Sequence, residues 1–218
     1  KKAKHVIACT PFLTEVALTY NPNVTDISST INTDSYKPVN LYNNDRKLVL
    51  GWSGSHSTSP FLYLLKDVLL ELHAKIPFKL LVMGDASFNI EGLDVEALPW
   101  SVESEIPTLQ RFDIGLYPLP LDNKWVLGKS GLKALQYMAV GLPVVATAIG
   151  ANYRIIENGK TGFLVKTKED WINQLVILMN DPGLRKNTGQ AAREAVVENY
   201  SIHANAPLYL SVITEACK

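Results

Sequence analysis

The sequence predicts an α/β protein whose main domain is a Rossmann-like, doubly wound parallel sheet. From residue 48 onward, short apolar runs alternate with stretches of amphipathic helical spacing. The short runs are continuously apolar, which is typical of strands buried on both faces. Strands that alternate with helices imply right-handed crossovers, so we expect a parallel sheet with helices on both faces.

The elements of this domain follow in order, and residues 48–200 hold them all. The expected strands are Leu48–Trp52, Lys79–Met83, Val95–Leu98, Phe112–Leu119, Pro143–Ala146 and Phe163–Val165. The expected helices are one capped by Ser59, one over Glu103–Arg111, one that contains Leu132, Leu135 and Ala139 and ends at Gly141, and two over Glu169–Asn180 and Leu184–Asn199.

The chain outside this domain divides into three further parts. Residues 1–38 predict a separate strand, helix and strand, residues 39–47 a polar linker rich in asparagine, and residues 201–218 a C-terminal helix. The chain does not begin with Met, which favours a piece of a longer protein. We find neither a signal peptide nor a convincing membrane span.

Charge and cysteine content exclude several classes of protein. Lysine plus arginine and aspartate plus glutamate number 21 each, so the net charge is zero and a nucleic-acid partner is disfavoured. Two cysteines, Cys9 and Cys217, exclude a disulfide scaffold and a cysteine-rich zinc site. An anionic ligand would therefore be bound by local donors.

The first candidate ligand loop follows the first strand of the domain. Ser53, Gly54 and Ser55 precede a helix N-terminus, where backbone N–H groups favour an anion. An ordinary serine-rich capped loop is the alternative.

The second candidate loop opens the helix before Gly141. Gly128, Lys129, Ser130 and Gly131 form another possible anion cradle. Asn123 stands where a P-loop requires glycine, so an NTP-hydrolysing P-loop is disfavoured. Lys129 is either a phosphate ligand or a solvated surface lysine.

Two further residues are candidates for nucleoside contacts. Gln136 could hydrogen-bond a ribose or be a satisfied internal polar group, and Trp100 could flank a base or be a partly buried aromatic. The histidines lack metal-ligand spacing, and no Ser/His/Asp set or carboxylate pair stands out. The catalytic residues therefore remain unassigned.

Several stretches, taken together, resemble family 4 glycosyltransferases. Residues 131–146, GLKALQYMAVGLPVVA, are similar to that family's G-L-x-x-L-E-A-M-A-x-G-x-P-V-V-A segment. The same order of family motifs continues in residues 83–85 (MGD), 112–118 (FDIGLYP), 156–165 (IENGKTGFLV) and the closing helices. The resemblance covers roughly residues 48–213.

The resemblance implies the GT-B fold, in which two Rossmann-like domains face each other. This chain would be mostly the donor-binding half, with residues 1–38 the remnant of the amino-terminal acceptor domain. Two family features are absent: the E-x7-E glutamates fall on Gly128 and Gln136, and serines and His56 replace the basic pair after the first strand. Lys129 could supply the lost positive charge.

The leading hypothesis is therefore a fragment of a retaining glycosyltransferase that uses a nucleotide-diphosphate sugar, with no cofactor and no metal. The expected donor-binding residues are Ser53, Gly54, Ser55, Trp100, Gly128, Lys129, Ser130, Gly131 and Gln136. The acceptor would be a glycan or lipid-linked sugar bound by the missing amino-terminal domain, in the cytoplasm or at the inner membrane face. The lost glutamates leave an alternative, a degenerate domain that binds nucleotide sugars or partner proteins without catalysis.

Overall fold

The computed structural model describes residues 3–39 and 46–218, and its centre is a parallel sheet of six strands. These are β3 (Leu48–Ser53), β4 (Phe78–Met83), β5 (Val95–Leu98), β6 (Ile114–Tyr117), β7 (Val144–Thr147) and β8 (Phe163–Val165). Their order in the sheet is β5-β4-β3-β6-β7-β8, and every neighbouring pair is parallel. This is the strand order of a Rossmann fold, which confirms the predicted fold class.

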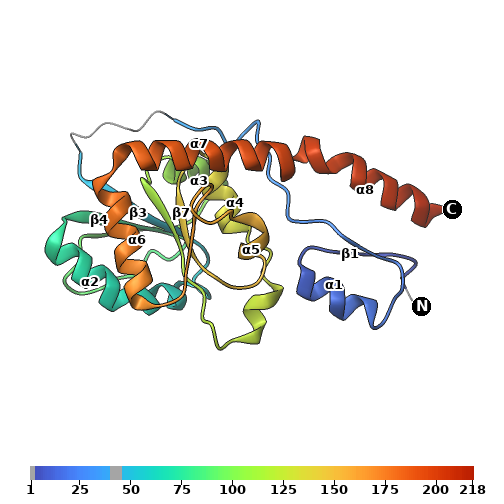
Figure 1. The fold of residues 1–218 in the computed structure, drawn as a ribbon, viewed down its shortest axis with the longest axis horizontal. Helices are drawn as coiled ribbons and strands as arrows, with labels where there is room; N and C mark the ends of the chain where they lie inside the picture. The colour runs from blue at the N-terminus through green and yellow to red at the C-terminus, as the bar shows by residue number, and fades with distance from the viewer. Residues whose placement is uncertain (1–2, 40–45) are drawn as a thin grey trace.

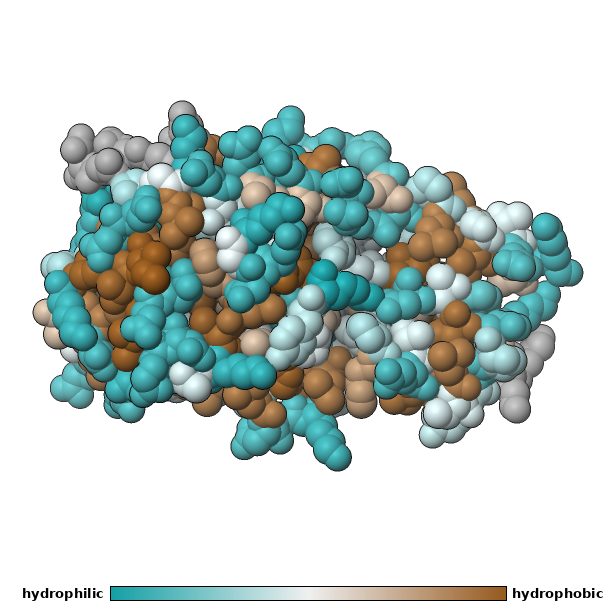
Figure 2. Space-filling model, viewed as in Figure 1, coloured by the Kyte–Doolittle hydropathy of each residue, from teal (hydrophilic) through white to brown (hydrophobic). Residues whose placement is uncertain are grey.

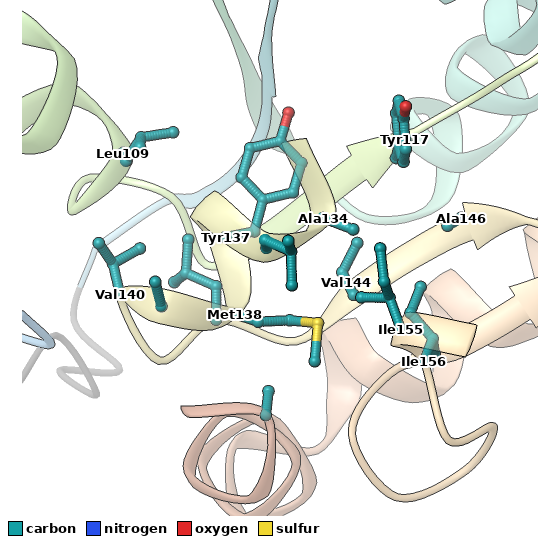
Figure 3. Packing of buried hydrophobic residues seen from close by; sticks show 14 of the residues in the cluster. Leu109, Tyr117, Ala134, Tyr137, Met138, Val140, Val144, Ala146, Ile155 and Ile156 are labelled. Atoms are coloured by element: carbon teal, nitrogen blue, oxygen red, sulfur yellow. The ribbon is translucent and has the colours of Figure 1, made fainter. Parts of the chain in front are cut away.

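Helices cover both faces of the sheet (Figure 1). The 3₁₀ helix η1 (Ser59–Leu65), α2 (Lys66–Lys75) and α6 (Lys168–Asn180) pack on one face, around Trp52 and Leu175. The opposite face carries α3 (Val102–Leu109), α4 (Leu132–Ala139), α5 (Asn152–Ile155) and α7 (Pro182–Asn199). Figure 3 shows α4 turning Tyr137 and Met138 into this second core.

The remaining elements lie at one end of the molecule. A two-stranded parallel sheet of β1 (Val6–Ala8) and β2 (Val24–Asp26) packs with α1 (Pro11–Leu18). The 3₁₀ helix η2 (Lys124–Gly128) contacts α1, and α8 (Ile202–Cys217) continues from α7 beyond the sheet (Figure 1). Figure 2 shows apolar side chains at the surface of this end, where Phe12 and Leu210 are exposed.

The predicted strands and helices are present with shifted ends, and two short elements, η2 and α5, were not predicted. The largest difference concerns the helix expected to be capped by Ser59, which is divided into η1 and α2. Ser59 is the first residue of η1 and not a cap, because its hydroxyl donates to Asp85 and to the His56 carbonyl.

The packing also differs from the predicted boundary at residue 38. At the junction of α7 and α8, the Ile31 N–H donates to the Tyr200 carbonyl at 2.8 Å, and the Ile202 N–H donates to the Ile31 carbonyl at 3.0 Å. Arg193 of α7 donates to the Thr33 carbonyl at 2.8 Å. Residues 31–33 therefore contact the six-stranded domain directly, and Arg154 of that domain also bonds to Asp26 and to the Cys9 carbonyl at 2.8 Å.

Among the described helices, none is both long and apolar enough to cross a membrane.

Candidate functional site

The strand order reverses between β3 and β6, and both strands point their carboxyl ends at the same edge of the sheet. Ligands of open α/β sheets bind beyond this edge. We call the ends of β3 and β6, with residues 53–59 and 117–133 that adjoin them, the switch edge. Both predicted ligand loops lie on it.

The loop after β3 is held by hydrogen bonds within the protein. The Ser53 N–H donates to the Tyr137 hydroxyl at 2.8 Å, the Gly54 N–H to the Met83 carbonyl at 2.9 Å, and the Ser55 N–H to Thr58 Oγ1 at 3.2 Å. The expectation of free N–H groups at these three positions is therefore wrong. Contacts from these residues to a donor would come from side chains and carbonyls.

A buried carboxylate fixes this loop to the end of β4. Asp85 accepts hydrogen bonds from the hydroxyls of Ser59 and Ser87 at 2.5 and 2.7 Å, and His56 Nδ1 lies 3.2 Å away. These donors hold the pKa of Asp85 well below its usual range. Gly84 permits the approach with φ +105°, because an added Cβ would lie 1.8 Å from the Gly54 carbonyl oxygen.

The loop before α4 leaves a helix N-terminus without a cap. Gly131, at the N-cap position with φ +75°, has no side chain to accept from the first turn. By contrast, α1, α3, α6, α7 and α8 are capped by the side chains of Thr10, Ser101, Thr167, Asp181 and Ser201, whereas α2 and α5 also lack a side-chain cap. The first N–H groups of α4 therefore remain available to a ligand.

Gly128, Lys129 and Ser130 precede this N-terminus and are all partly exposed. Lys129 Nζ lies 5.7 Å from the centroid of the Phe61 ring on η1, so the side chain reaches across the switch edge. A Cβ added at Gly128 would meet Leu13 at an ordinary 3.7 Å. The fold therefore does not require glycine at the position where the resemblance expects a glutamate.

Lys133, on the first turn of α4, is a site residue that the sequence reasoning missed. Its Nζ lies 5.0 Å from the Trp52 ring centroid, 5.8 Å from the Tyr117 ring centroid and 3.3 Å from Thr58 Oγ1. Burial, with the charge of Lys129, lowers the pKa of Lys133 to about 8. We call Lys129 and Lys133 the lysine pair.

Gln136, one turn further along α4, joins a second group of polar side chains. Its amide nitrogen donates to Glu105 Oε1 at 3.0 Å and to the Tyr36 hydroxyl at 3.2 Å. Tyr36 donates to Glu105 Oε2 at 2.5 Å, and Trp100 Nε1 donates to Glu105 Oε1 at 3.0 Å. We call Tyr36, Trp100, Glu105 and Gln136 the Glu105 cluster.

The cluster explains why glutamine suits position 136. A glutamate there would face the Glu105 carboxylate across about the same 3.0 Å, and like charges at this distance oppose ionisation. The glutamine amide instead donates a hydrogen bond. Burial and Glu105 also raise the pKa of Tyr36 to about 12, so its hydroxyl remains a donor.

The structure thus brings the predicted residues together in two groups. Trp100 and Gln136, 36 residues apart, share Glu105 as an acceptor, although Trp100 is half exposed. Lys129, Ser130 and Gly131 lie beside the start of α4. Tyr36, Glu105 and Lys133 were missed because their hydrogen bonds to Gln136 and Thr58 span 31 to 100 residues of sequence.

A Rossmann sheet with an uncapped helix at its switch edge is an arrangement typical of α/β domains that bind nucleotides. Comparison with known proteins gives the family: residues 47–181 match the model of Glycosyl transferases group 1. The chain belongs to this family.

Individual relatives agree with this assignment. The chain is 31% identical over 134 residues to the D-inositol 3-phosphate glycosyltransferase of Pseudarthrobacter chlorophenolicus, an alignment that covers 57% of this chain and 32% of that protein. The chain thus spans about a third of the length of this curated relative.

Solved structures show the same fold. A glycosyltransferase from Rickettsia africae superimposes with a TM-score of 0.80 at 19% identity, over 99% of this chain and 64% of that one. Anabaena HepE, solved in complex with UDP-glucose, superimposes with a TM-score of 0.75 at 16% identity, over 98% of this chain and 65% of that one. These neighbours confirm that the sheet is that of a GT-B glycosyltransferase.

Proposed function

We propose that this chain is the donor-binding part of a retaining glycosyltransferase that transfers a sugar from a nucleotide-diphosphate sugar to a glycan or lipid-linked acceptor. The observation that carries the proposal is the uncapped N-terminus of α4 beside Lys129, at the point where the strand order reverses. N–H groups and a cation there suit the phosphates of a nucleotide. The solved complex of HepE with UDP-glucose supports the same ligand class.

The chemistry follows from where charge develops. As the sugar leaves, negative charge builds on the diphosphate oxygens, and the helix N-terminus and Lys129 stabilise it in place of a metal ion. Gly128, Ser130 and Gly131 would lie against the diphosphate and the sugar. The acceptor attacks the face from which the diphosphate departs, so the reaction needs no nucleophile from the protein.

The nucleoside would lie at the Glu105 cluster. Trp100 presents a half-exposed ring to the base, and Gln136 lies within the same hydrogen-bonded group for the ribose. A ribose bound here must either replace the hydrogen bonds within the Glu105 cluster or add to them. Ser53, Gly54 and Ser55 would form the opposite wall, ordered by Tyr137 and Thr58.

The acceptor would bind beside residues 3–26, which would be part of an amino-terminal acceptor domain. Leu13 of α1 faces Gly128 next to the lysine pair, so an acceptor held there would be close to the donor. A cytoplasmic location accompanies this proposal, at the inner face of the membrane where the acceptor is lipid-linked.

The test is a panel of UDP, GDP, ADP and their sugar conjugates, measured by the melting temperature of this chain. A ligand at a hundred times its dissociation constant adds about 2.7 kcal/mol, which raises the melting temperature by roughly 2–4 °C at this size. A shift with one base supports the donor site and identifies the nucleotide. No shift with any of them contradicts the proposal for this chain.

A transfer assay on the intact protein separates the enzyme from the non-catalytic alternative. With the nucleotide sugar that shifts the melting temperature, a cell-extract acceptor pool should become labelled. Binding without transfer would instead support a domain that binds nucleotide sugars only.

A further inference from the structure

Lys133 crosses the switch edge from one face of the sheet to the other. Its backbone belongs to α4, which packs on the same face as Tyr117. Its ammonium group lies near the Trp52 ring, which packs on the opposite face with η1 and α2. The side chain therefore lies over the ends of β3 and β6, where the proposed donor binds.

The groups in direct contact with the ammonium group are uncharged. In the part of the chain that the structure describes, Lys133 makes no ion pair, and its polar contact is the Thr58 hydroxyl at 3.3 Å. The aromatic faces of Trp52 and Tyr117 stabilise a cation partly. Asp85, the buried acid of the adjacent loop, is occupied by two serines and His56.

A second positive charge lies beside it. Burial, and after it the like charge of Lys129, lowers the pKa of Lys133, as expected for a desolvated cation near a second cation. Two lysines without a carboxylate between them cost folding free energy, because a buried charge is ordinarily paired. An anion placed between them, at the uncapped start of α4, would remove that cost.

Resting on the proposed function, we propose that Lys133 is a phosphate-binding residue of the donor site and binds the diphosphate of the nucleotide together with Lys129. The strand-side loop that bears Ser53 and Gly54 has its N–H groups engaged, so the positive charge at this site comes from α4 and the residues just before it. Lys133 would contact the phosphates from the sheet side and Lys129 from the side of η2.

The test is Lys133→Met, which keeps the length and apolar character of the stem between the two rings. Its binding of the nucleoside diphosphate chosen from UDP, GDP and ADP is measured by calorimetry, beside the matching nucleoside and inorganic pyrophosphate. We expect roughly tenfold or greater loss for the diphosphate and for pyrophosphate, and no change for the nucleoside. Lys160→Met, a lysine in an exposed pair with Glu157, is the matched control.

A second measurement uses the unmodified protein. The pKa of Lys133, followed by the NMR shift of its ε-carbon, should rise when the diphosphate is added. Lys129 and Tyr117 are the ionisable groups beside it, so a control titration in Lys129→Ala isolates the effect of the ligand.

The outcomes are separable. If the wild-type chain binds none of the three nucleoside diphosphates, the proposed function fails and this inference fails with it. If the wild type binds one of them and Lys133→Met binds it equally well, the inference alone is overturned. If the variant loses the nucleoside to the same extent as the diphosphate, Lys133 is a structural residue and not a phosphate ligand.

Discussion

The lysine pair and the Glu105 cluster lie one turn apart on α4, yet they differ in how their polar groups are satisfied. Lys133 has two aromatic rings and a hydroxyl around its charge, and the helix N-terminus beside it has no cap. Glu105, in contrast, accepts hydrogen bonds from Tyr36, Trp100 and Gln136. Among the described residues no carboxylate pairs with Lys133, whereas Glu105 is paired with three donors from the protein itself.

The difference suggests which part of a nucleotide contributes most to binding. At the lysine pair a diphosphate gains contacts without breaking any hydrogen bond of the protein. At the Glu105 cluster a ribose must compete with bonds already made, and net gains from such an exchange are small. We therefore expect affinity to come chiefly from the phosphates and selectivity from the cluster.

The largest effect is expected for Gln136→Glu, which removes one of the hydrogen-bond donors to Glu105. The variant loses a hydrogen bond to a charged group and faces Glu105, so the free energy of unfolding at neutral pH should fall by about 2 kcal/mol. Urea unfolding measures it. Adding Glu105→Gln should restore most of the loss, since the acceptor and donor then exchange places; an equal loss in the double variant would contradict this explanation.

The unpaired charge of Lys133 should make the free energy of unfolding depend on pH. The pKa of Lys133 is lowered to about 8 from 10.5, so between about pH 8 and pH 10 the unfolded chain holds a proton that the folded protein has lost. Lys133 should therefore raise the free energy of unfolding with pH, by about 2 kcal/mol over this range. This is the contribution of Lys133 alone: from about pH 9 upward the raised pKa values of Tyr36, Tyr117, Tyr137 and Tyr200 oppose it, because the unfolded chain loses those phenol protons first.

Urea unfolding at a series of pH values checks this. Lys133→Met should be more stable than the wild type at pH 7, and this difference in the free energy of unfolding should shrink by about 2 kcal/mol between pH 8 and pH 10. An unchanged pH dependence would mean that Lys133 is not the group that titrates.

Turnover of the intact enzyme tests the other lysine. Lys129→Ala should lower turnover by roughly tenfold or more, because a cation at the departing diphosphate is lost. Lys160→Ala, which removes an exposed lysine, should leave turnover unchanged. Equal rates for wild type and Lys129→Ala would refute the role of Lys129.

The smallest expected effect is that of Tyr36→Phe, which loosens the Glu105 cluster without adding charge. One hydrogen bond to a carboxylate and one from Gln136 are lost, and the free energy of unfolding should fall by about 1 kcal/mol. Trp100 and Gln136 still donate to Glu105, so nucleoside selectivity should persist. Loss of selectivity would show that Tyr36 positions the ligand.

Much of the fold was predictable from local patterns. Buried strands such as Leu80–Val82 and Val144–Ala146 read as continuous apolar runs, and the helix that ends at Gly141 has clear apolar spacing. Where prediction failed, a distant contact decided. The sequence around Ser59 resembles a helix cap, but its hydroxyl donates to Asp85, 26 residues later in the sequence. The segment that follows is the 3₁₀ helix η1, and α2 begins after it.

The candidate site divides in the same way. Lys129 and Gly131 were recognisable because glycine and lysine at a helix start have a local meaning. Lys133 had no such signal, since its spacing only places it on a helix. Its role depends on Trp52 and Tyr117, which meet at the switch edge once β3 and β6 are paired.

The sequence by itself determined the alternation of strands and helices, the parallel sheet and the two loops that reach its carboxyl edge, because burial and helix periodicity are properties of neighbouring residues. Only the tertiary structure decided that the N–H groups of Ser53 and Gly54 are already bonded, that Glu105 unites Trp100 with Gln136, and that Lys133 lies without an acid at the switch edge. Hydrogen bonding and charge pairing depend on distance in space, and no local pattern specifies which side chains from separate elements will meet.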